Sequence, residues 1–240
     1  MKTAIVTGAT KGIGLAIARM LLKEGYHVVA TYAHDSASAE RCREELSTIS
    51  SNFTIVRADQ SDKASMREFV KYIKGAYTSV EAIVCNAGTT LRCPFEEITD
   101  EDWERMMQVN LNSNLYLIRD LNKMIAPNSR IIFIGSLMGV YPHGTSLAYG
   151  VTKSALHALA LNLVKCFEGT NTTVNAIAPG FVETEWQASK PQQIRDNIVA
   201  KSAIKRFATT DEVAEAVRFC INNAFVNGSI IEVSGGYNFK

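Results

Sequence analysis

Short hydrophobic runs alternate with longer segments of mixed polarity along most of this chain. The runs are rich in valine and isoleucine and nearly continuous, as in strands that are buried on both faces of a parallel sheet. They predict seven strands, at Thr3–Thr7, His27–Tyr32, Thr54–Ala58, Ala82–Asn86, Arg130–Gly135, Thr173–Ala178 and Ser229–Val233.

The segments between these runs have the amphipathic spacing of helices. Two of them begin with a threonine followed three residues later by an acidic residue, which is a capping-box pattern. The predicted helices are Leu15–Glu24, Ala37–Leu46, Ala64–Ile73, Asp100–Met124, Ala148–Glu168 and Glu212–Ile221. This alternation predicts an α/β fold of the Rossmann type, in which a doubly wound, seven-stranded parallel sheet carries helices on both faces. We expect a single domain over residues 1–240.

One stretch, at about residues 181–206, lacks this rhythm and contains Trp186 and Pro191. It follows the sixth predicted strand and therefore leaves the sheet at its carboxyl edge, where open α/β sheets bind ligands. We interpret it as a substrate lid. An ordinary pair of surface helices is the alternative.

Composition and charge fit a globular protein with a sizeable core. Of 240 residues, 47% are hydrophobic and 20% are charged, and the formal net charge is +1. The absence of a basic block disfavours nucleic acid as a partner. No apolar run approaches the roughly 20 residues that span a bilayer, and the first residues predict a strand and not a signal peptide. Five scattered cysteines without a C-x-x-C pair favour reduced thiols in the cytoplasm and no metal site.

A glycine-rich turn connects the first predicted strand to the first helix. It has the spacing G-x-x-x-G-x-G, a variant of the dinucleotide fingerprint. Glycines permit the tight turn and let backbone N–H groups approach a pyrophosphate at the helix N-terminus. A turn retained for packing is the alternative. The candidate cofactor residues are Gly8, Thr10, Lys11, Gly12, Ile13 and Gly14.

Tyr149 and Lys153 stand four residues apart in a predicted helix, and Ser136 lies thirteen residues before the tyrosine. Residues at i and i+4 share a helix face. An ammonium beside a phenol favours the phenolate, so we expect Lys153 to lower the Tyr149 pKa from about 10. Such a tyrosine can donate or accept a proton at neutral pH. The serine hydroxyl can hold a carbonyl oxygen beside it, so the set predicts a carbonyl reductase or an alcohol dehydrogenase.

The end of the second predicted strand indicates which cofactor is used. NAD enzymes place an acid there for the ribose 2′-hydroxyl, whereas this chain has Tyr32, Ala33 and His34, with no acid before Asp35. Lys11 is a cation placed to meet a 2′-phosphate, although a solvated turn lysine is the alternative. These features favour NADP(H) over NAD.

These motifs together resemble the short-chain dehydrogenase/reductase superfamily. The resemblance rests on TGATKGIG at residues 7–14, Asn86-Ala87-Gly88, Asn110, Ser136, Tyr149-x-x-x-Lys153 and Pro179-Gly180, in that order. It covers the whole chain. The segment APGFVET and the glycines near the C-terminus resemble the 3-oxoacyl-acyl-carrier-protein reductases.

The resemblance implies a role for each residue. Tyr149 would be the general acid in reduction, Lys153 would bind the nicotinamide ribose, and Ser136 would hold the substrate oxygen. Asn110 would anchor a water in a proton relay. Further cofactor contacts would come from Asp59 and Gln60 at the adenine, Asn86, Ala87 and Gly88 beneath its ribose, and Pro179, Gly180, Val182 and Thr184 at the carboxamide.

The implied activity is NADPH-dependent reduction of a ketone, first of all a 3-oxoacyl thioester as in fatty acid biosynthesis. A dehydrogenase of a sugar, a steroid or another secondary alcohol is the alternative, and a non-catalytic nucleotide-binding regulator is a third hypothesis. A partly apolar substrate pocket would include Leu137, Met138, Tyr141, Phe181 and Trp186, and His143 is either a pocket or a surface residue. Arg130 could receive an acyl carrier protein, but 168–172 lacks a second basic contact.

A family member of this kind is usually a homotetramer. The helix that carries Tyr149 is apolar nearly all round, which predicts burial on both sides. The residues concerned are Ala155, Leu156, Leu159, Ala160 and Leu163. A dimer is the fallback, and a monomer is the alternative.

Overall fold

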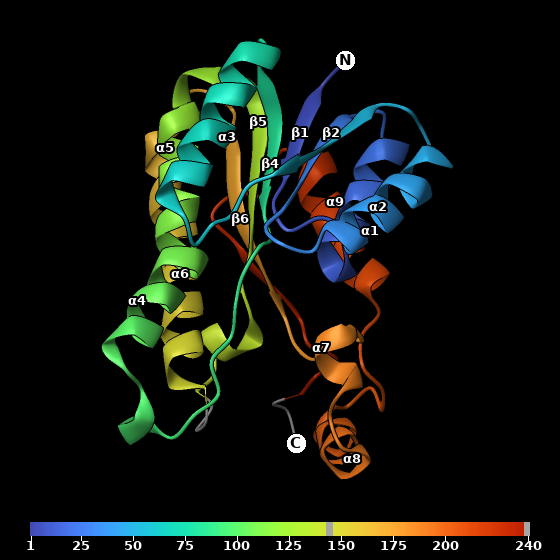
Figure 1. The fold of residues 1–240 in the computed structure, drawn as a ribbon, viewed down its shortest axis with the longest axis vertical. Coiled ribbons are helices and arrows are strands. Elements are labelled where there is room, and N and C mark those ends of the chain that lie inside the picture. The colour runs from blue at the N-terminus through green and yellow to red at the C-terminus, as the bar shows by residue number, and fades with distance from the viewer. Residues whose placement is uncertain (143–145, 238–240) are drawn as a thin grey trace.

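The computed structural model of the chain describes residues 1–142 and 146–237. A seven-stranded sheet with the order β3-β2-β1-β4-β5-β6-β7 forms its centre, and all neighbouring strands are parallel (Figure 1). The strands are β1 (Thr3–Val6), β2 (His27–Tyr32), β3 (Phe53–Arg57), β4 (Val80–Cys85), β5 (Ile125–Ile134), β6 (Thr173–Pro179) and β7 (Ile230–Val233). The predicted doubly wound parallel sheet is therefore confirmed.

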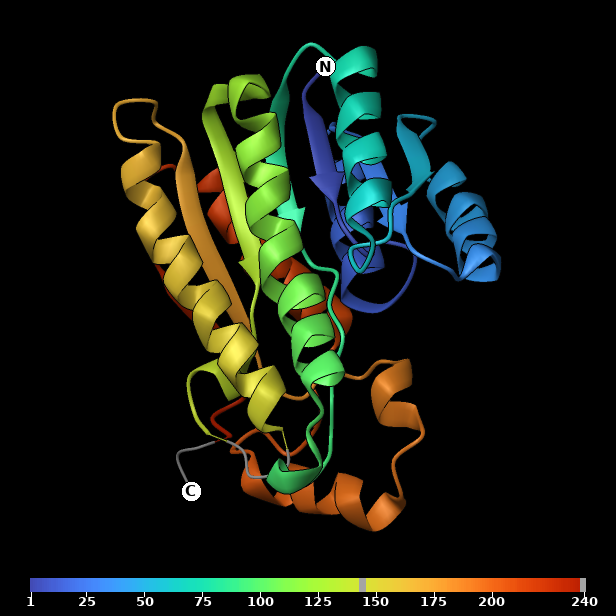
Figure 2. The same ribbon diagram turned by 60° about the vertical axis from the view of Figure 1, so that its left-hand side comes forward.

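Helices cover both faces of this sheet (Figures 1 and 2). One face carries α1 (Gly12–Lys23), α2 (Ser36–Ser47) and α9 (Thr210–Asn222), and the other carries α3 (Lys63–Ala76), α4 (Asp100–Met107), α5 (Ser113–Leu121) and α6 (Leu147–Cys166). A separate hydrophobic core fills each interface. The strands are buried on both sides for this reason, and every residue of β1 and β6 is buried.

The structure differs from the sequence prediction between residues 100 and 130. The single helix expected over Asp100–Met124 is divided into α4, a π-helical turn η2 (Gln108–Asn112), α5 and a short 3₁₀ turn η3 (Asn122–Met124). The strand β5 begins at Ile125, earlier than expected. Single π turns inside helical segments are rare and frequently lie at functional sites. The π turn contains Asn110, one of the predicted site residues.

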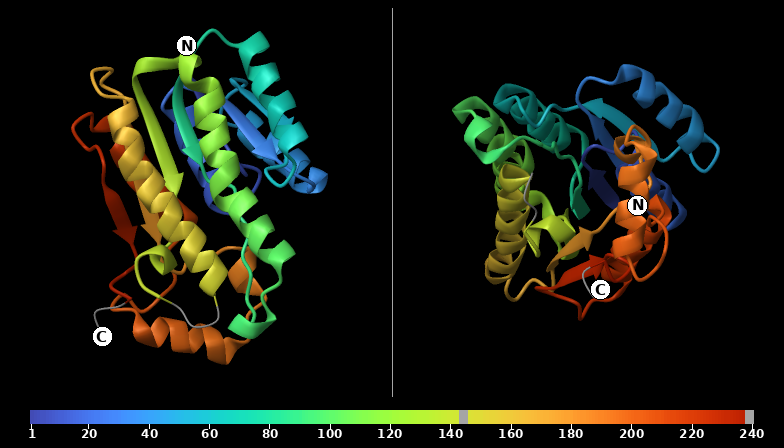
Figure 3. Two further views of the ribbon diagram at one scale, coloured as in Figure 1. Left: turned by 90° about the vertical axis from the view of Figure 1, so that its left-hand side faces the viewer. Right: turned by 90° about the horizontal axis from the view of Figure 1, so that it is seen from below.

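The segment predicted as a lid contains two helices, α7 (Glu185–Ala188) and α8 (Gln192–Lys201). Both lie beyond the carboxyl edge of the sheet, as Figures 2 and 3 show. A parallel bridge between Val182 and Ala208 joins the two ends of the segment. We refer to residues 181–206 as the lid segment.

Candidate active site

The glycine turn is fixed to the end of β4 by the side chain of Asn86. Its amide donates to the carbonyl oxygens of Thr7 and Gly8, both at 2.9 Å. Gly8 has a φ of 60°, in the left-handed region that favours glycine. A Cβ on Gly14 would lie 2.2 Å from the Gly8 carbonyl oxygen and 2.5 Å from Asn86 Nδ2. Glycine is therefore required at these two positions, and Asn86 supports the turn.

The turn leads directly into the N-terminus of α1, where Lys11 is the N-cap residue and makes no side-chain cap. Backbone N–H groups at a helix N-terminus attract anions. Thr184, after β6, approaches this turn, because its Cγ2 would lie 3.6 Å from a Cβ on Gly12. The structure thus brings together the glycine turn and Thr184.

Lys11 is an ion-pair partner of two carboxylates, which the sequence argument did not foresee. Its Nζ lies 3.0 Å from Asp35 Oδ2 and 3.2 Å from Glu185 Oε2. Asp35 also caps α2 by accepting from Ser38 N. Hydrogen bonds from Ser38 and Lys11 hold the pKa of the Asp35 carboxyl well below its usual range. Positions 32–34 contain no acid, as noted above, but folding brings Asp35 and the distant Glu185 to Lys11, so this lysine is not simply solvated.

The end of β2 lies beside the end of β3, in the region where the sequence predicts the adenosine of the cofactor. Nε of Arg57 donates to the Ala33 carbonyl oxygen at 3.0 Å, and His34 Nε2 lies 2.9 Å from Asp59 Oδ2. Tyr32 and Ala33 are partly exposed. Asp59 and the residues after β2 therefore share one region.

Gln60 does not join that region. Its side chain is buried and donates to Ser113 Oγ at 2.6 Å and Asn114 Oδ1 at 3.0 Å. The predicted contact with an adenine ring is not supported, because the side chain points into the interior beneath the π turn. There it connects the end of β3 to α5.

Asn110 is fully buried in the π turn, and both the oxygen and the nitrogen of its side-chain amide form hydrogen bonds. Its Oδ1 accepts from Thr89 N at 2.8 Å, and its Nδ2 donates to the Thr89 carbonyl oxygen and to Thr152 Oγ1, both at 3.0 Å. A Cβ on Gly88 would lie 3.2 Å from Asn110 Oδ1 and 3.5 Å from Lys153 Nζ. The loop after β4, the π turn and α6 therefore meet at Gly88.

Tyr149 and Lys153 lie on one face of α6, as their spacing predicted. Lys153 Nζ is 5.7 Å from the centroid of the Tyr149 ring and donates to the Ile134 carbonyl oxygen at 2.8 Å. Burial lowers the pKa of Lys153 to about 8, and the Cys85 thiol opposes this only partly. The ammonium is thus close to the phenol but is hydrogen-bonded to the end of β5.

The pKa of Tyr149 differs from the sequence expectation. Burial raises the pKa of its phenol above the usual value, and Ser136 and the charge of Arg92 oppose the rise. The expected lowering by Lys153 is not found, because burial outweighs the attraction of neighbouring charges. A phenol with a raised pKa remains protonated at neutral pH.

Ser136 begins a 3₁₀ turn, η4 (Leu137–Gly139), and its Oγ accepts from Met138 N at 3.1 Å. His157 packs beneath this turn. A Cβ on Gly135 would lie 1.9 Å from His157 Nε2, and that nitrogen accepts from Ser136 N at 3.4 Å. Burial and then the Lys153 charge lower the pKa of His157 to about 4. The neutral imidazole therefore positions Ser136.

Only part of the predicted substrate pocket lies near these residues. Leu137 is buried, and Met138 and Tyr141 are partly buried in the segment after Ser136. Phe181 instead packs against Tyr237 at a centroid distance of 5.0 Å and lines a separate cavity with it. Its assignment to the pocket is not supported. Trp186 on α7 is 53% exposed. His143 lies outside the described residues.

The turn after β6 keeps its predicted position at the edge of the sheet. Pro179 ends β6, Gly180 N donates to the Val233 carbonyl oxygen at 2.9 Å, and Val182 is buried. A Cβ on Gly180 would lie 3.1 Å from Ser234 Cα. The backbone is therefore held between β7 and the glycine turn.

Three cations and one acid near the site were not identified from the sequence. They are Arg57 at the end of β3, Arg92 in the loop after β4, Lys190 between α7 and α8, and Glu185 on α7. They belong to no local motif. Only their position after strands or in the lid segment, at the carboxyl edge, could have indicated them.

The described residues contain no candidate membrane span and no candidate metal cluster. Across residues 1–142 and 146–237, no helix is both long and apolar enough to cross a bilayer. No group of three His, Cys, Asp or Glu side chains in these residues could hold a metal ion.

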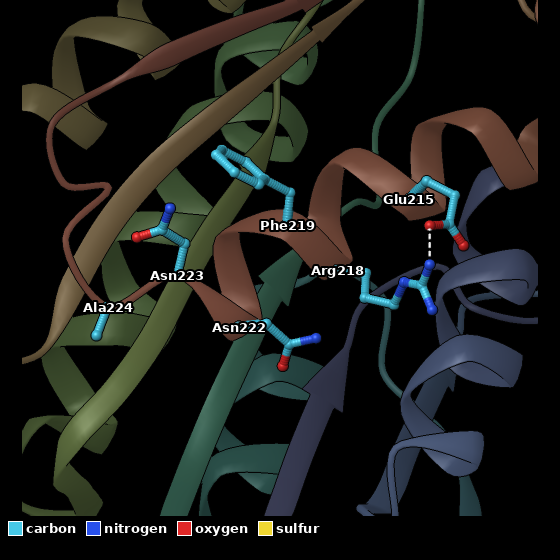
Figure 4. A pocket seen from close by; sticks show the side chains of 6 residues that line it. All are labelled: Glu215, Arg218, Phe219, Asn222, Asn223 and Ala224. Carbon is cyan, nitrogen blue, oxygen red and sulfur yellow. Dashed lines mark hydrogen bonds and ion pairs between the residues drawn. The ribbon is translucent and has the colours of Figure 1, made fainter.

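A surface hollow lies at the C-terminal end of α9, on the sheet face opposite α6 (Figures 1 and 4). It contains none of the predicted site residues.

Residues 2–195 match the family model described as short chain dehydrogenase. The chain therefore belongs to the short-chain dehydrogenase family, and its fold and the arrangement of Ser136, Tyr149 and Lys153 agree with this. It is an oxidoreductase family that acts on alcohols and ketones.

Individual relatives cover nearly the whole chain. A 2-dehydro-3-deoxy-D-gluconate 5-dehydrogenase of Pseudoalteromonas atlantica is 32% identical and aligns with 98% of this chain and 95% of its own length. A 3-oxoacyl-acyl-carrier-protein reductase of Escherichia coli is 30% identical, with coverages of 98% and 96%. A blue fluorescent protein from a metagenomic library, solved in complex with NADPH, superposes with a TM-score of 0.92 at 28% identity, covering 98% and 97% of the two chains.

Proposed function

We propose that this protein is an NADPH-dependent reductase that transfers hydride to a ketone. The observation that carries the proposal is the meeting of Asn110, Ser136, Tyr149 and Lys153 at the carboxyl edge of the sheet, where the glycine turn also lies. A nucleotide-binding regulator without chemistry would not need this set.

The residues present fit a dinucleotide. Gly8 and Gly14 leave no room for a side chain between the turn and β4, so a pyrophosphate can approach the backbone at the start of α1. The residues after β2 and Asp59 would hold the adenosine, Lys153 the nicotinamide ribose, and Val182 and Thr184 the carboxamide. When bound, NADPH supplies the hydride to the carbonyl carbon.

The side chains on α6 and η4 supply the proton. The hydroxyls of Ser136 and Tyr149 would hold the ketone oxygen, and Tyr149 would protonate it as negative charge develops. The raised pKa of Tyr149 keeps the phenol protonated before reaction, as a general acid requires. The Lys153 ammonium, 5.7 Å from the ring, would stabilise the phenolate that remains.

NADP(H) remains the proposed cofactor. Lys11 stands at the glycine turn, Arg57 at the end of β3, and no acid occupies positions 32–34. A solved relative at 28% identity contains NADPH. Lys11 would exchange a contact with Asp35 or Glu185 for the 2′-phosphate, which reduces the net gain from that charge.

The first candidate substrate is a 3-oxoacyl thioester, because a reductase of such substrates is 30% identical to this chain. The alternative, a sugar-like secondary alcohol, is favoured by the relative named as a dehydrogenase of a deoxygluconate derivative, at 32%. The Arg130 guanidinium is already hydrogen-bonded to backbone carbonyls at Asn128, Ser129 and Ile221. This engagement weakens the proposal of a carrier-protein contact there.

A ketone panel tests the proposed function. NADPH absorbance is followed with 3-oxoacyl thioesters, keto sugars and simple ketones. We expect consumption that depends on a ketone and exceeds the rate with NADH. Tight NADPH binding with no consumption by any ketone would contradict the reductase and favour the regulator.

We also propose a cytoplasmic homotetramer. All five cysteines are free, as reducing compartments favour. The outward face of α6 is formed by Leu147, Val151 and Leu161, each more than 40% exposed, whereas Leu156, Ala160 and Leu163 face the sheet. These three exposed side chains, which differ from the residues named in the sequence analysis, support a packing surface on α6. Phe219, beside the hollow in Figure 4, is 50% exposed and offers a second apolar surface. Light scattering that gives a mass near 26.3 kDa would exclude the tetramer.

A further inference from the structure

A chain of buried hydrogen bonds begins at Gln60 and ends at the backbone of Tyr149. Gln60 Nε2 donates to Asn114 Oδ1 at 3.0 Å, and Asn114 Nδ2 donates to the Asn110 carbonyl oxygen at 2.9 Å. Asn110 Nδ2 donates to Thr152 Oγ1 at 3.0 Å, and that hydroxyl donates to the Tyr149 carbonyl oxygen at 2.8 Å. The chain therefore joins the end of β3 to the first turn of α6 through α5 and the π turn.

The whole chain lies in the interior of the protein. The four side chains that form these bonds are at most 4% exposed. Figure 2 shows α6 beside the helical segment that contains the π turn, so the chain crosses between neighbouring elements. Buried polar networks that are satisfied make the segments they connect rigid. The first turn of α6, which carries Tyr149, is therefore held by side chains from outside that helix.

The same group of side chains also binds the backbone of the π turn. The Asn110 carbonyl oxygen accepts from Asn114, and the Val109 carbonyl oxygen accepts from Ser113 Oγ at 2.9 Å. Buried backbone carbonyl groups need such partners. These bonds stabilise the turn conformation in which the Asn110 side chain reaches Thr152.

The amide of Gln60 is held in one orientation, and this orientation has a cost. Its Nε2 lies 2.6 Å from Ser113 Oγ, whose proton is already donated to Val109, and its second acceptor is Asn114 Oδ1. Reversing the amide would place two acceptor oxygens together. In the present orientation, Gln60 Oε1 is buried and has no hydrogen-bond partner among the described residues. Such an atom destabilises a fold and calls for an explanation, which the bonds of Nε2 provide.

We propose that Gln60 is a positioning residue of the active site. Through the hydrogen-bond chain it fixes the first turn of α6, and thereby the place of the Tyr149 hydroxyl relative to the ketone. The inference rests on the proposed function, in which that hydroxyl protonates the ketone oxygen. A reacting group that is misplaced by about 1 Å can reduce the rate ~10²-fold, even when the change lies far from the chemistry.

Gln60→Met tests the beginning of the chain, because methionine has a similar length and no N–H donor. We expect kcat for the ketone that is reduced fastest to fall about 10- to 100-fold, with an unchanged NADPH dissociation constant. Rates are expressed per NADPH-binding site, so that unfolded protein is not counted. Asn114→Leu should cause the same loss. The double variant should lose no more than either single variant, because residues in one network do not act additively.

Thr152 offers a matched pair of substitutions at the other end of the chain. Thr152→Val keeps the shape of the side chain and removes the hydroxyl, whereas Thr152→Ser keeps the hydroxyl. The valine variant should lose kcat as Gln60→Met does, and the serine variant should keep most of it. This pair also decides the question if Gln60→Met does not fold.

Gln108→Met is the control for the loop that follows β3. Gln108 Nε2 donates to the Gln60 carbonyl oxygen at 3.1 Å, so it holds the same loop but lies outside the chain. This variant should keep the wild-type kcat.

The solvent isotope effect on kcat distinguishes positioning from stability. It is a ratio of rates in H₂O and D₂O and does not depend on the fraction of protein that is folded. Displacement of the Tyr149 hydroxyl slows proton transfer, which then limits the rate more strongly. The effect should therefore be larger in Gln60→Met and Thr152→Val than in wild type and Gln108→Met.

The outcomes separate the two proposals. Wild type that reduces no ketone would overturn the proposed function, and this inference with it. Turnover by wild type with the same kcat in Gln60→Met would overturn only the inference. A lower kcat without a larger solvent isotope effect would also overturn it, as would an equal loss in Gln108→Met, which would assign the effect to the attachment of the loop.

Discussion

Lys153 on α6 and Lys190 in the lid segment both have a pKa of about 8, but for different reasons. Lys153 is almost fully buried, and its ammonium is bound by the Ile134 carbonyl oxygen at the end of β5. The low pKa of Lys190 comes from partial burial together with two neighbouring cations, Arg92 and Arg195.

These different causes indicate which of the two lysine pKa values would respond to a bound anion. The surroundings of Lys153 are made mainly by its burial in the core of the fold. Those of Lys190 are made by like charges, so an anion placed among them would raise its pKa and remove the repulsion. The proposed proton chemistry belongs to the α6 side, and the lid segment carries the charge that a bound anion would change most.

The largest expected effect belongs to the α6 side. Tyr149→Phe keeps the ring near Lys153 and deletes the hydroxyl. Turnover should fall ~10²–10⁴-fold, the usual contribution of general acid–base catalysis, while the NADPH dissociation constant stays the same. Tyr72→Phe, on α3, is the control. Near-normal turnover of the Tyr149 variant would refute its assignment as the acid.

The buried ammonium of Lys153 predicts a pH-dependent stability. Its pKa is about 8 in the folded protein against 10.5 for a lysine side chain in water, so the unfolded chain binds more protons between these pH values. The free energy of unfolding should therefore rise with pH in this window, by about 3 kcal/mol from this residue. Chemical denaturation of wild type and Lys153→Met across the window measures the difference. Parallel curves would show that Lys153 is not desolvated as described.

A smaller effect is expected at Lys11. Unlike Lys153 and Lys190, this lysine is exposed and forms ion pairs with two carboxylates. Glu185→Gln removes one of its two acidic partners and leaves it freer for a 2′-phosphate. NADPH should bind about two- to fivefold more tightly, the range of an exposed ion pair, with NADH unchanged. Asp35→Asn is a matched variant, because asparagine can still accept from Ser38 and cap α2. Lys11→Ala should narrow the preference for NADPH.

The sequence predicted what local patterns encode. The strands are continuous apolar runs, and the turn at Gly8–Gly14 and the Tyr149–Lys153 pair are short motifs with fixed spacing, so their positions followed directly. The π turn was missed because a single turn of five residues, Gln108–Asn112, within a long helical segment has no sequence signature of its own.

Other features depend on contacts between distant segments. Gln60 turns inward because α5 offers it two polar partners, and Phe181 turns toward Tyr237 near the end of the described chain. The pairing of Lys11 with Glu185 joins residues that share no motif. Single-sequence periodicity carries no information about such pairs.

The central claim is that hydride reaches a ketone at this site while Tyr149 protonates its oxygen. NADPH deuterated at the carbon that donates hydride tests it most directly, with the ketone that is reduced fastest in the panel as substrate and mass spectrometry of the product. The account predicts one deuterium on the new alcohol carbon, formed by wild type and at a greatly reduced rate by Tyr149→Phe. Absence of deuterated alcohol from every ketone tested, in protein that binds NADPH, would contradict it.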